Sequence, residues 1–440
     1  MRIGIFGSGY VGLVTGAAFA QLGHHVVVYD NDATKIASLR DRRVPFYEPG
    51  LADLIERNAE RLDFADEPTA AAAARDVVFI AVGTPSAGDG RADLASVCRA
   101  ARTIAERIDG PTVIVNKSTV PVQTADVVER IVREAARRTD VRVVSNPEFL
   151  REGAAIHDFF HPDRIVLGCD DPWAENVMRA LYAPLAAPVV VSDRRSAELI
   201  KYAANAFLAT RISYINEIAA ICEHTGADVD AVIEGIGLDR RIGRDYLEPG
   251  LGFGGSCLPK DVRALAATAA RVAVEPTLLA AVLRVNETQL ERVRSRLSYV
   301  LAGLRGRRIA LLGLSFKPQT DDLRESPALA LAAALAAEGA SIAAHDPAAT
   351  ASARALLGNA VTICEDAEDA LFGADAMVVA TSWPDYARLE PNAVAARMRR
   401  RVVFDLRRAL DGDAFAAAGF LYLAVGSPDR AYPLDAGATA

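Results

Sequence analysis

The sequence is poor in cysteine and in aromatic residues, and it contains no long apolar segment. Its five cysteines are an odd number without a CxxC pair, which excludes a disulfide framework and the common zinc patterns. The longest apolar run, 328–337, is mostly alanine and far shorter than the roughly 20 residues that span a bilayer. We therefore expect a protein of a reducing, cytoplasmic compartment, without a membrane partner and without a metal site.

An excess of basic residues is also missing. The 49 Lys and Arg residues are outnumbered by 57 Asp and Glu residues, and the formal net charge is −8. This balance argues against nucleic acid as a partner, although local groups can still bind small anionic ligands. The N-terminus begins with a strand-like segment rather than a charged stretch followed by an apolar run, so no secretory signal is expected.

The 440 residues are enough for two or three domains. The first part of the chain alternates short β-rich segments with helical patterns, which predicts a parallel sheet with helices on both faces. A helix is expected at 11–22. The predicted strands are 2–6, 25–29, 76–82, 112–116, 141–145 and 164–168.

The middle of the chain has the spacing of helices. From Asp193 onward, apolar residues recur at helical intervals as far as Gly226. Asp193 is a suitable N-cap, and Gly226 is a suitable residue at the C-terminal end. Further helices are expected at 229–236 and between 261 and 300. The length of the first helix indicates a spine between domains and a dimer interface.

The last part of the chain repeats the pattern of the first. The segment 307–318, a helix and the segment 339–347 correspond to 2–12, a helix and 23–32. The predicted fold is therefore α/β, with two Rossmann-like doubly wound domains joined by a long central helix and a helical middle domain. The expected boundaries are 1–192, 193–300 and 301–440.

The turn after the first strand fits a nucleotide site. GSGYVG (7–12) lies between a strand and a helix, and Asp30 ends the next strand. Gly7 permits a tight turn, Gly9 lets a pyrophosphate approach, and Gly12 allows the helix to pack closely, while N–H groups of the helix bind the phosphates. Asp30 would bind ribose hydroxyls and repel a 2′-phosphate, which favours NAD over NADP. The second repeat lacks these glycines, so no dinucleotide is expected there.

Cys257 lies in GFGGSCLPKD (252–261), a glycine-rich segment without helical periodicity. A thiolate suits an NAD-dependent enzyme whose product is an acid, because it adds to an aldehyde and holds the carbon as a thioester after a second hydride transfer. Lys260, or a helix that begins at Asp261, would lower the pKa of this thiol. We expect the glycines to leave room for sugar and cofactor. The other four cysteines are interpreted as structural.

These motifs together resemble the nucleotide-sugar dehydrogenase family, in the family's order and over nearly the whole chain. The resemblance implies two Rossmann-like domains bridged by a dimer-forming helix, with an N-terminal NAD-binding domain and a C-terminal domain that binds the nucleotide sugar. It also implies oxidation of a sugar C-6 alcohol to a carboxylate with two NAD per turnover. The matching segments are GSGYVG (7–12), YDND (29–32), VPFYEPGL (44–51), AVGTP (81–85), KSTVP (117–121), NPEFLREG (146–153), KYAANAFLATRISYINEIA (201–219), GFGGSCLPKD (252–261) and FKPQTDDLRESP (316–327).

The resemblance assigns roles to individual residues. Cys257 is the expected nucleophile. Lys201 is similar to the family's oxyanion-stabilising lysine, and Asn205 lies one helical turn later on the same face. Asp261 and Thr119 resemble the pair that holds a water used in proton transfer.

Two carboxylates in one loop compete for the remaining catalytic role. Glu148 is the expected base for the hydrolytic water, and Glu152, expected beside the nicotinamide, is the alternative. Residues implied at the cofactor are Gly7, Gly9, Tyr10, Val11, Gly12, Asp30, Lys35, Gly83, Thr84, Pro85, Thr119, Glu152, Lys260 and Arg324. Residues implied at the substrate are Glu148, Phe149, Leu150, Arg151, Glu152, Lys201, Asn205, Tyr246, Leu247, Glu248, Pro249, Gly250, Gly254 and Lys317.

UDP-glucose is the expected substrate, and a homodimer is the expected assembly. GDP-mannose and UDP-N-acetylmannosamine are the alternative substrates within the family. A hydroxyacid dehydrogenase that removes only two electrons would not need Cys257. A non-enzymatic NAD-binding regulator would have no reason to keep Lys201, Asn205, Cys257 and Asp261 together.

Overall fold

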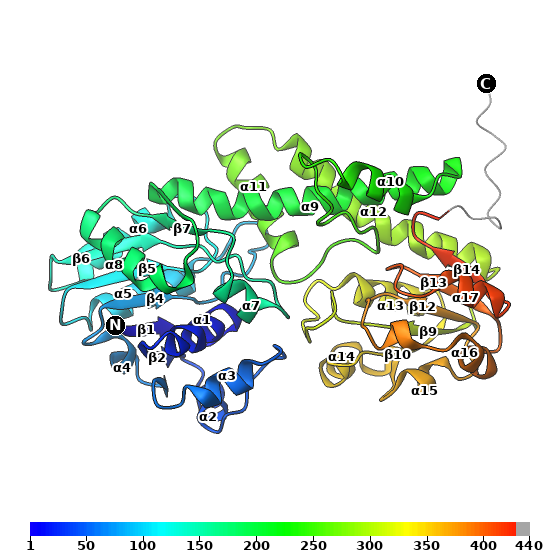
Figure 1. The fold of residues 1–440 in the computed structure, drawn as a ribbon, viewed down its shortest axis with the longest axis horizontal. Coiled ribbons are helices and arrows are strands. Elements are labelled where there is room, and N and C mark those ends of the chain that lie inside the picture. Colours follow the sequence, from blue (N-terminus) through cyan, green and yellow to red (C-terminus); the bar gives the residue numbers. More distant parts are fainter. Residues whose placement is uncertain (428–440) are drawn as a thin grey trace. The chain divides into compact units, whose positions relative to one another are not determined.

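The computed structural model describes residues 1–427, so the end of the predicted 301–440 domain lies outside the described residues. The chain folds into two compact units. The first consists of 1–205 and 263–275, and the second consists of 206–262 and the chain from 276 onward. Each unit is an open, mostly parallel sheet with helices on both faces (Figure 1). The predicted fold class, two Rossmann-like domains with a helical middle region, is confirmed.

The first unit contains an eight-stranded sheet in the order β3-β2-β1-β4-β5-β6-β7-β8. Its neighbouring strands pair in parallel, apart from the antiparallel pair β6 and β7. The first six strands follow the Rossmann order, so the carboxyl ends of β1 and β4 meet at the switch point where dinucleotides bind. The bounds are β1 (Arg2–Phe6), β2 (His25–Tyr29), β3 (Leu62–Ala65), β4 (Val77–Ile80), β5 (Thr112–Asn116), β6 (Val141–Ser145), β7 (Ile165–Gly168) and β8 (Val189–Ser192).

Alternate strand residues of this sheet enter two separate apolar layers. One layer packs beneath α1, α3, α7 and α8, and the other packs beneath α4, α5 and α6. Strands with both faces covered have few polar positions, which explains near-continuous apolar runs such as 77–80. The bounds are α1 (Tyr10–Gln21), α2 (Ala33–Arg40), α3 (Leu51–Arg57), α4 (Pro68–Ala72), α5 (Ala95–Ala105), α6 (Thr124–Ala135), α7 (Ala155–Phe160) and α8 (Pro172–Tyr182).

The second unit contains a six-stranded parallel sheet in the order β11-β10-β9-β12-β13-β14, which repeats the order of the first six strands of the other sheet. The predicted internal repeat is therefore present in the topology. The strands are β9 (Arg308–Leu312), β10 (Ser341–His345), β11 (Thr362–Ile363), β12 (Ala376–Val379), β13 (Val402–Asp405) and β14 (Leu421–Ala424), and the helices that follow β9 are α13 (Pro327–Ala337), α14 (Thr350–Leu357), α15 (Ala367–Leu371), α16 (Pro391–Arg397) and α17 (Gly412–Ala417).

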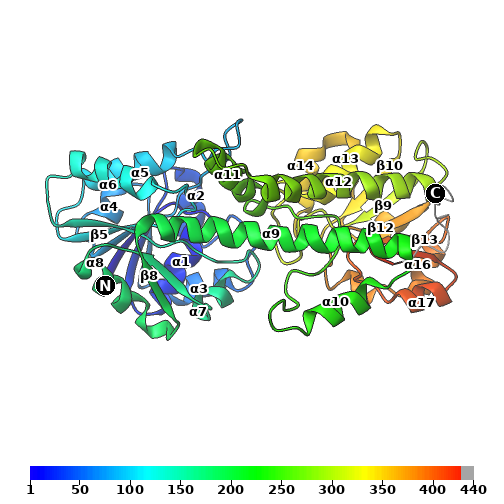
Figure 2. The ribbon, with the colours of Figure 1, turned by 90° about the horizontal axis from the view of Figure 1, so that it is seen from above.

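The long helix predicted from Asp193 is α9 (Arg194–Thr225). The Asp193 carboxylate accepts a hydrogen bond of 2.9 Å from the backbone N–H of Ser196, so it caps the helix as predicted. In the second unit, the later part of α9 lies beside α12 (Thr277–Val300), as Figure 2 shows, and the Ser213 hydroxyl donates to the carbonyl of Val282. The remaining helices of the middle region are α10 (Val229–Gly237) and α11 (Leu258–Arg271).

Four strands were not predicted from the sequence: β3, β8, β11 and β14. Each has four residues or fewer and is only partly buried, so it shows neither a clear alternation nor the buried apolar run that marks the four-residue strands β4 and β7. Helix α11 begins at Leu258, three residues before the predicted start at Asp261. The predicted boundaries at 192 and 300 follow the sequence pattern, whereas the division between compact units passes through α9 and α11.

Candidate functional site

The glycines of the first turn have different structural roles. Gly7 has a φ of 110°, and a Cβ there would lie 2.5 Å from the carbonyl oxygen of Ala81. A Cβ at Gly12 would lie 1.9 Å from the carbonyl oxygen of Gly7. Both are needed for the protein's own packing. A Cβ at Gly9 would meet no protein atom within 4 Å, so this side of the loop is open, as the approach of a pyrophosphate requires.

Asp30 lies at the end of β2, beside this turn. Its Oδ2 accepts hydrogen bonds of 2.8 Å from both the backbone N–H and the hydroxyl of Ser8, and its Oδ1 accepts one of 3.0 Å from the N–H of Asp32. The side chain is only half-buried, so it keeps acceptor capacity for ribose hydroxyls. These residues fit a bound NAD, with its pyrophosphate at the N-terminus of α1.

The corresponding turn of the second unit does not fit a dinucleotide. Asp346 is completely buried, and its Oδ2 accepts bonds from the N–H groups of Leu314 and Ser315 and from the Ser315 hydroxyl. Its Oδ1 accepts two further backbone N–H groups. The buried indole of Trp383 donates to Ser315 and Asp346 at 3.2 and 3.3 Å. The carboxylate that could bind a ribose is thus used inside the protein.

The loops after β4 and β5 are joined close to the first turn. The Thr84 hydroxyl donates to the carbonyl of Thr119 at 2.8 Å, and the Ser118 hydroxyl donates to the carbonyl of Val82 at 2.7 Å. Thr84 and Ser118 are buried. Two loops at neighbouring carboxyl strand ends therefore form one braced wall of the predicted cofactor site.

Tyr10, which we predicted at the cofactor, uses its hydroxyl within the protein. The hydroxyl hydrogen-bonds to Glu48, whose carboxylate also accepts the N–H groups of Gly153 and Ala155 at 2.6 and 2.8 Å. Burial and the adjacent Glu48 raise the pKa of Tyr10. Glu48 thus connects the glycine turn to the 148–153 loop, a role that the sequence did not reveal.

Glu148 and Lys201 form a buried ion pair. The Lys201 Nζ lies 3.0 Å from the Glu148 Oε1, and each side chain is only 5% exposed. The other carboxylate oxygen accepts the N–H of Leu150 at 2.6 Å. Asn205 is also buried. Because the side chains of Lys201 and Asn205 are buried, these residues do not simply form a solvated face of the helix.

The rest of the 148–153 loop is less enclosed. The Arg164 guanidinium stacks on the Phe149 ring at 3.5 Å, and the Lys201 Nζ lies 5.3 Å from the same ring. Arg151 forms a two-pronged pair with Asp158, at 2.9 and 2.7 Å. Leu150 and Glu152 are partly buried. Of the two competing carboxylates, Glu148 is the buried one, and it is held by the Lys201 ammonium and the Leu150 N–H.

Cys257 immediately precedes α11. Its carbonyl accepts the N–H of Asp261 at 2.9 Å, and the Ser256 hydroxyl lies 3.5 Å from its sulfur. The residue is partly exposed, unlike buried Cys169, Cys222 and Cys364. Because the helix starts at Leu258, the sulfur lies closer to the positive end of the helix dipole than predicted, which favours an anion there.

The neighbouring glycines pack against protein, which differs from our expectation that they leave room for ligands. A Cβ at Gly254 would lie 2.3 Å from the carbonyl oxygen of Glu325, and one at Gly255 would lie 2.7 Å from the Phe316 ring. The absence of side chains lets the cysteine segment approach the FKPQTDDLRESP segment. The glycines therefore fix the position of the Cys257 backbone.

Two predicted cofactor ligands of the second unit have carboxylate partners nearby in sequence. Lys260 lies 2.5 Å from the Oδ1 of Asp261, whose side chain is fully buried. Arg324 makes a two-pronged pair with Asp322, including a contact of 2.7 Å. The Lys317 Nζ lies 5.7 Å from the Phe316 ring. If Lys260 or Arg324 binds a cofactor or substrate, its positive charge is shared between that ligand and the neighbouring carboxylate.

The predicted substrate segment 246–250 lies against the second sheet. Leu247 belongs to the hydrophobic core rather than to an open surface. A Cβ at Gly250 would lie 2.7 Å from a guanidinium nitrogen of Arg407. Burial lowers the pKa of Arg407 to about 10, while Asp405 and Glu248 oppose that shift. Arg407 follows the buried strand β13, a strand-end position that makes it a candidate site residue which the sequence analysis did not name.

The predicted residues are distributed over both units. The first unit holds the NAD turn and Thr119, Glu148, Lys201 and Asn205, whereas Cys257, Lys260 and Asp261 belong to the second. Lys35, Gly83, Pro85 and Glu248 are exposed, Val11 and Tyr246 are partly buried, and Pro249 is buried. Among residues 1–427, no group of His, Cys, Asp and Glu is arranged to hold a metal ion.

Comparison with known proteins assigns nearly the whole chain to one family. The UDP-glucose/GDP-mannose dehydrogenase family matches in three parts: its NAD binding domain at 1–186, its central domain at 195–288 and its UDP binding domain at 310–412. The UDP-glucose 6-dehydrogenase of Rhizobium meliloti is 48% identical over 439 residues, which cover 98% of this chain and 100% of the relative.

Solved structures give the same result. A UDP-glucose dehydrogenase from Pyrobaculum islandicum matches with a TM-score of 0.89 and 42% identity, covering 97% of this chain and 98% of the other. A UDP-D-ManNAc dehydrogenase from Pyrococcus horikoshii matches with a TM-score of 0.85 and 26% identity, covering 98% and 100%. This chain belongs to the UDP-glucose/GDP-mannose dehydrogenase family, and its first domain is the family's NAD-binding domain.

Proposed function

We propose that this chain oxidises UDP-glucose to UDP-glucuronate, with two NAD consumed per turnover. The observation that carries this proposal is the partly exposed Cys257 at the start of α11, in a protein with a complete NAD turn. The choice of sugar is supported by 48% identity to a UDP-glucose 6-dehydrogenase, against 26% to a UDP-D-ManNAc dehydrogenase.

The first oxidation removes a hydride from C-6 of the sugar and a proton from its hydroxyl. NAD supplies the hydride acceptor. A water held by Thr119 receives the proton, and the Lys201 ammonium stabilises the negative charge that develops on the oxygen. The product of this step is an aldehyde.

The second oxidation requires the thiolate of Cys257. A C–S bond forms to the aldehyde carbon, and the carbonyl π electrons move to the oxygen, giving a thiohemiacetal anion. Loss of a second hydride, which a second NAD would accept, restores the C=O bond and leaves a thioester. Without the thiol, the aldehyde would have to react as its hydrate.

Hydrolysis then releases the acid. Water attacks the thioester carbon, Glu148 accepts the water's proton, and the C–S bond breaks with its electrons returning to sulfur. The ion pair with Lys201 and the Leu150 N–H fix the orientation of the Glu148 carboxylate. These contacts support Glu148 over Glu152 as the base.

The NADH yield per sugar nucleotide tests the reaction. About two NADH per UDP-glucose are expected, with little turnover of GDP-mannose or UDP-N-acetylmannosamine. Cys257→Ser should stall at or after the first oxidation, because an alkoxide is a poorer nucleophile and leaving group here. Cys98→Ser is the matched control, since Cys98 is also partly exposed but lies on α5. A ratio near one in the unmodified enzyme would refute the thioester pathway.

We also propose that the protein is a homodimer and works in the cytoplasm. The later part of α9 exposes Phe207, Tyr214 and Ile221 to 63, 52 and 51%, at intervals of seven residues, which gives one apolar stripe suited to a second copy. Phe207→Glu should give a monomer by light scattering coupled to size exclusion. A reducing compartment would keep Cys257 as a thiol. No helix within residues 1–427 is long and apolar enough to cross a bilayer.

A further inference from the structure

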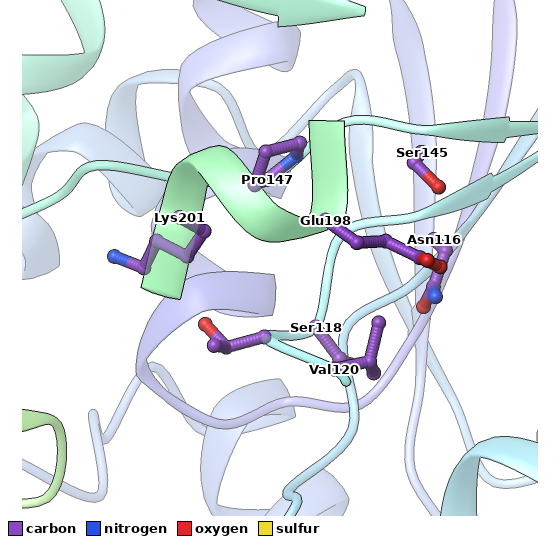
Figure 3. A pocket seen from close by; sticks show the side chains of 8 residues that line it. Asn116, Ser118, Val120, Ser145, Pro147, Glu198 and Lys201 are labelled. Carbon is purple, nitrogen blue, oxygen red and sulfur yellow. The ribbon is translucent and has the colours of Figure 1, made fainter. Parts of the chain in front are cut away.

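A small cavity lies in the first unit, beneath the loop that carries Thr119. Figure 3 shows the Glu198 carboxylate reaching toward the Asn116 amide, with Ser145 nearby, while Lys201 points away from them. The volume open to the centre of a water molecule is about 10 Å³. One water molecule requires about this much room. The lining of the cavity includes Asn116, Ser118, Thr119, Ser145 and Glu198.

The cavity is lined by polar atoms that need a partner. Asn116 and Ser145 are each 2% exposed. Within the part of the chain that the structure describes, neither the amide oxygen nor the amide nitrogen of Asn116 has a hydrogen-bond partner, and the Ser145 hydroxyl has none. Such groups are expensive to bury unpaired. A water beside them would supply donors and acceptors for all three atoms.

Glu198 connects the cavity to the start of α6. Its Oε2 accepts the N–H of Gln123, and its Oε1 accepts the N–H of Ala125, both at 2.7 Å. Gln123 has a φ of 80°, a left-handed conformation that is unfavourable for a residue with a side chain. The two hydrogen bonds that this one carboxylate accepts offset the strain and satisfy donors at the helix N-terminus.

We propose that the cavity binds one water molecule through Asn116, Ser145 and Glu198, and that Glu198 is a positioning residue that holds the 117–123 loop, with Thr119, against helix α9. Glu198 lies one turn before Lys201 on α9 and is 3% exposed. It thereby links the backbone that carries Lys201 to the loop that carries Thr119.

The charge of Glu198 is sensitive to pH in the physiological range. Burial raises the pKa of this carboxyl to about 7, against the lowering effect of the two backbone hydrogen bonds. The adjacent Asp126 also raises the pKa, and Arg194 lowers it. A protonated carboxyl has one strong acceptor oxygen instead of two, so it holds the loop less firmly. The amide of Glu198→Gln mimics this weaker state.

The experiment compares Glu198→Gln with Glu134→Gln, a control carboxylate that is exposed on the last part of α6. We expect Glu198→Gln to lower kcat about tenfold, the effect of one lost hydrogen bond to a buried group, with little change in KM for either substrate. The kcat–pH profile of the unmodified enzyme should show a limb near pH 7 that disappears in Glu198→Gln. An unchanged kcat and profile would overturn the positioning role.

Loop anchoring is measured separately, because its effect on kcat rests on the proposed role of Thr119. Hydrogen–deuterium exchange of the peptide that spans 117–127 should be about tenfold faster in Glu198→Gln than in Glu134→Gln. Faster exchange with unchanged kcat would refute the role of Thr119 but keep the anchor, whereas unchanged exchange refutes the anchor itself.

The water is tested in the unmodified protein, so the test does not depend on whether a variant folds. A crystal structure at high resolution should show one density peak within hydrogen-bond distance of Asn116, Ser145 and Glu198. A Ser145→Ala crystal should show weaker or displaced density at the same place. An empty cavity in the unmodified protein would overturn the water site.

Discussion

Replacing Lys201 by Met provides a quantitative test of the buried ion pair with Glu148. The two charges are 3.0 Å apart and each side chain is 5% exposed, so the substitution leaves a carboxylate buried without its cation. Removing one partner of such a pair costs roughly 3–5 kcal/mol. For a unit of this size, about 2–4 °C per kcal/mol corresponds to a fall in melting temperature of roughly 6–20 °C.

The assay is differential scanning calorimetry of three variants: Lys201→Met, Lys201→Met with Glu148→Gln, and Lys35→Met. The double variant should recover much of the lost stability, because it removes the unpaired charge while keeping the volume and the acceptor for the Leu150 N–H. Lys35 is exposed, so its replacement should change the free energy of unfolding by at most about 0.5 kcal/mol.

The kcat of Lys201→Met provides a second, independent test. If Lys201 stabilises a developing oxyanion, Lys201→Met should lower kcat by about 100- to 1000-fold. A melting temperature equal to that of Lys35→Met, with no recovery in the double variant, would refute the reasoning about the buried pair. A normal kcat in folded Lys201→Met would refute the catalytic role.

Three further predictions follow from the two Rossmann turns and from Glu198. Asp30→Asn should raise the KM for NAD about tenfold and reduce the preference for NAD over NADP; equal preference before and after the change would contradict the ribose contact. Trp383→Ala should lower the free energy of unfolding by about 3–5 kcal/mol, as measured by urea denaturation, while calorimetric titration still finds one NAD per chain. Because the folded pKa of Glu198 is about 7, above its usual 4.5, its contribution to stability is complete below about pH 4.5 and is lost as the pH rises through 7, by about 3 kcal/mol. Glu198→Gln should flatten this part of the stability–pH curve, and an unaltered slope would contradict the assignment.

The local pattern of the sequence was sufficient for the fold. Alternation of apolar strands with helical periodicity defined both sheets, and the strand–glycine–helix order identified the NAD turn before any tertiary information. Four short strands, β3, β8, β11 and β14, escaped this reasoning, because they are recognisable only by the neighbours that pair with them.

The sequence by itself determined the chemistry, because a residue type and its place in a motif are local properties: the thiol of Cys257, the carboxylate of Asp30 and the glycines of the first turn. Tertiary structure decided which of these groups are enclosed and what each contacts. Only the fold pairs Glu148 with Lys201, because these residues are far apart in the chain and meet through β6 and α9. Likewise, Asp30 and Asp346 end equivalent strands, but burial and the indole of Trp383 leave only Asp30 able to receive a ribose.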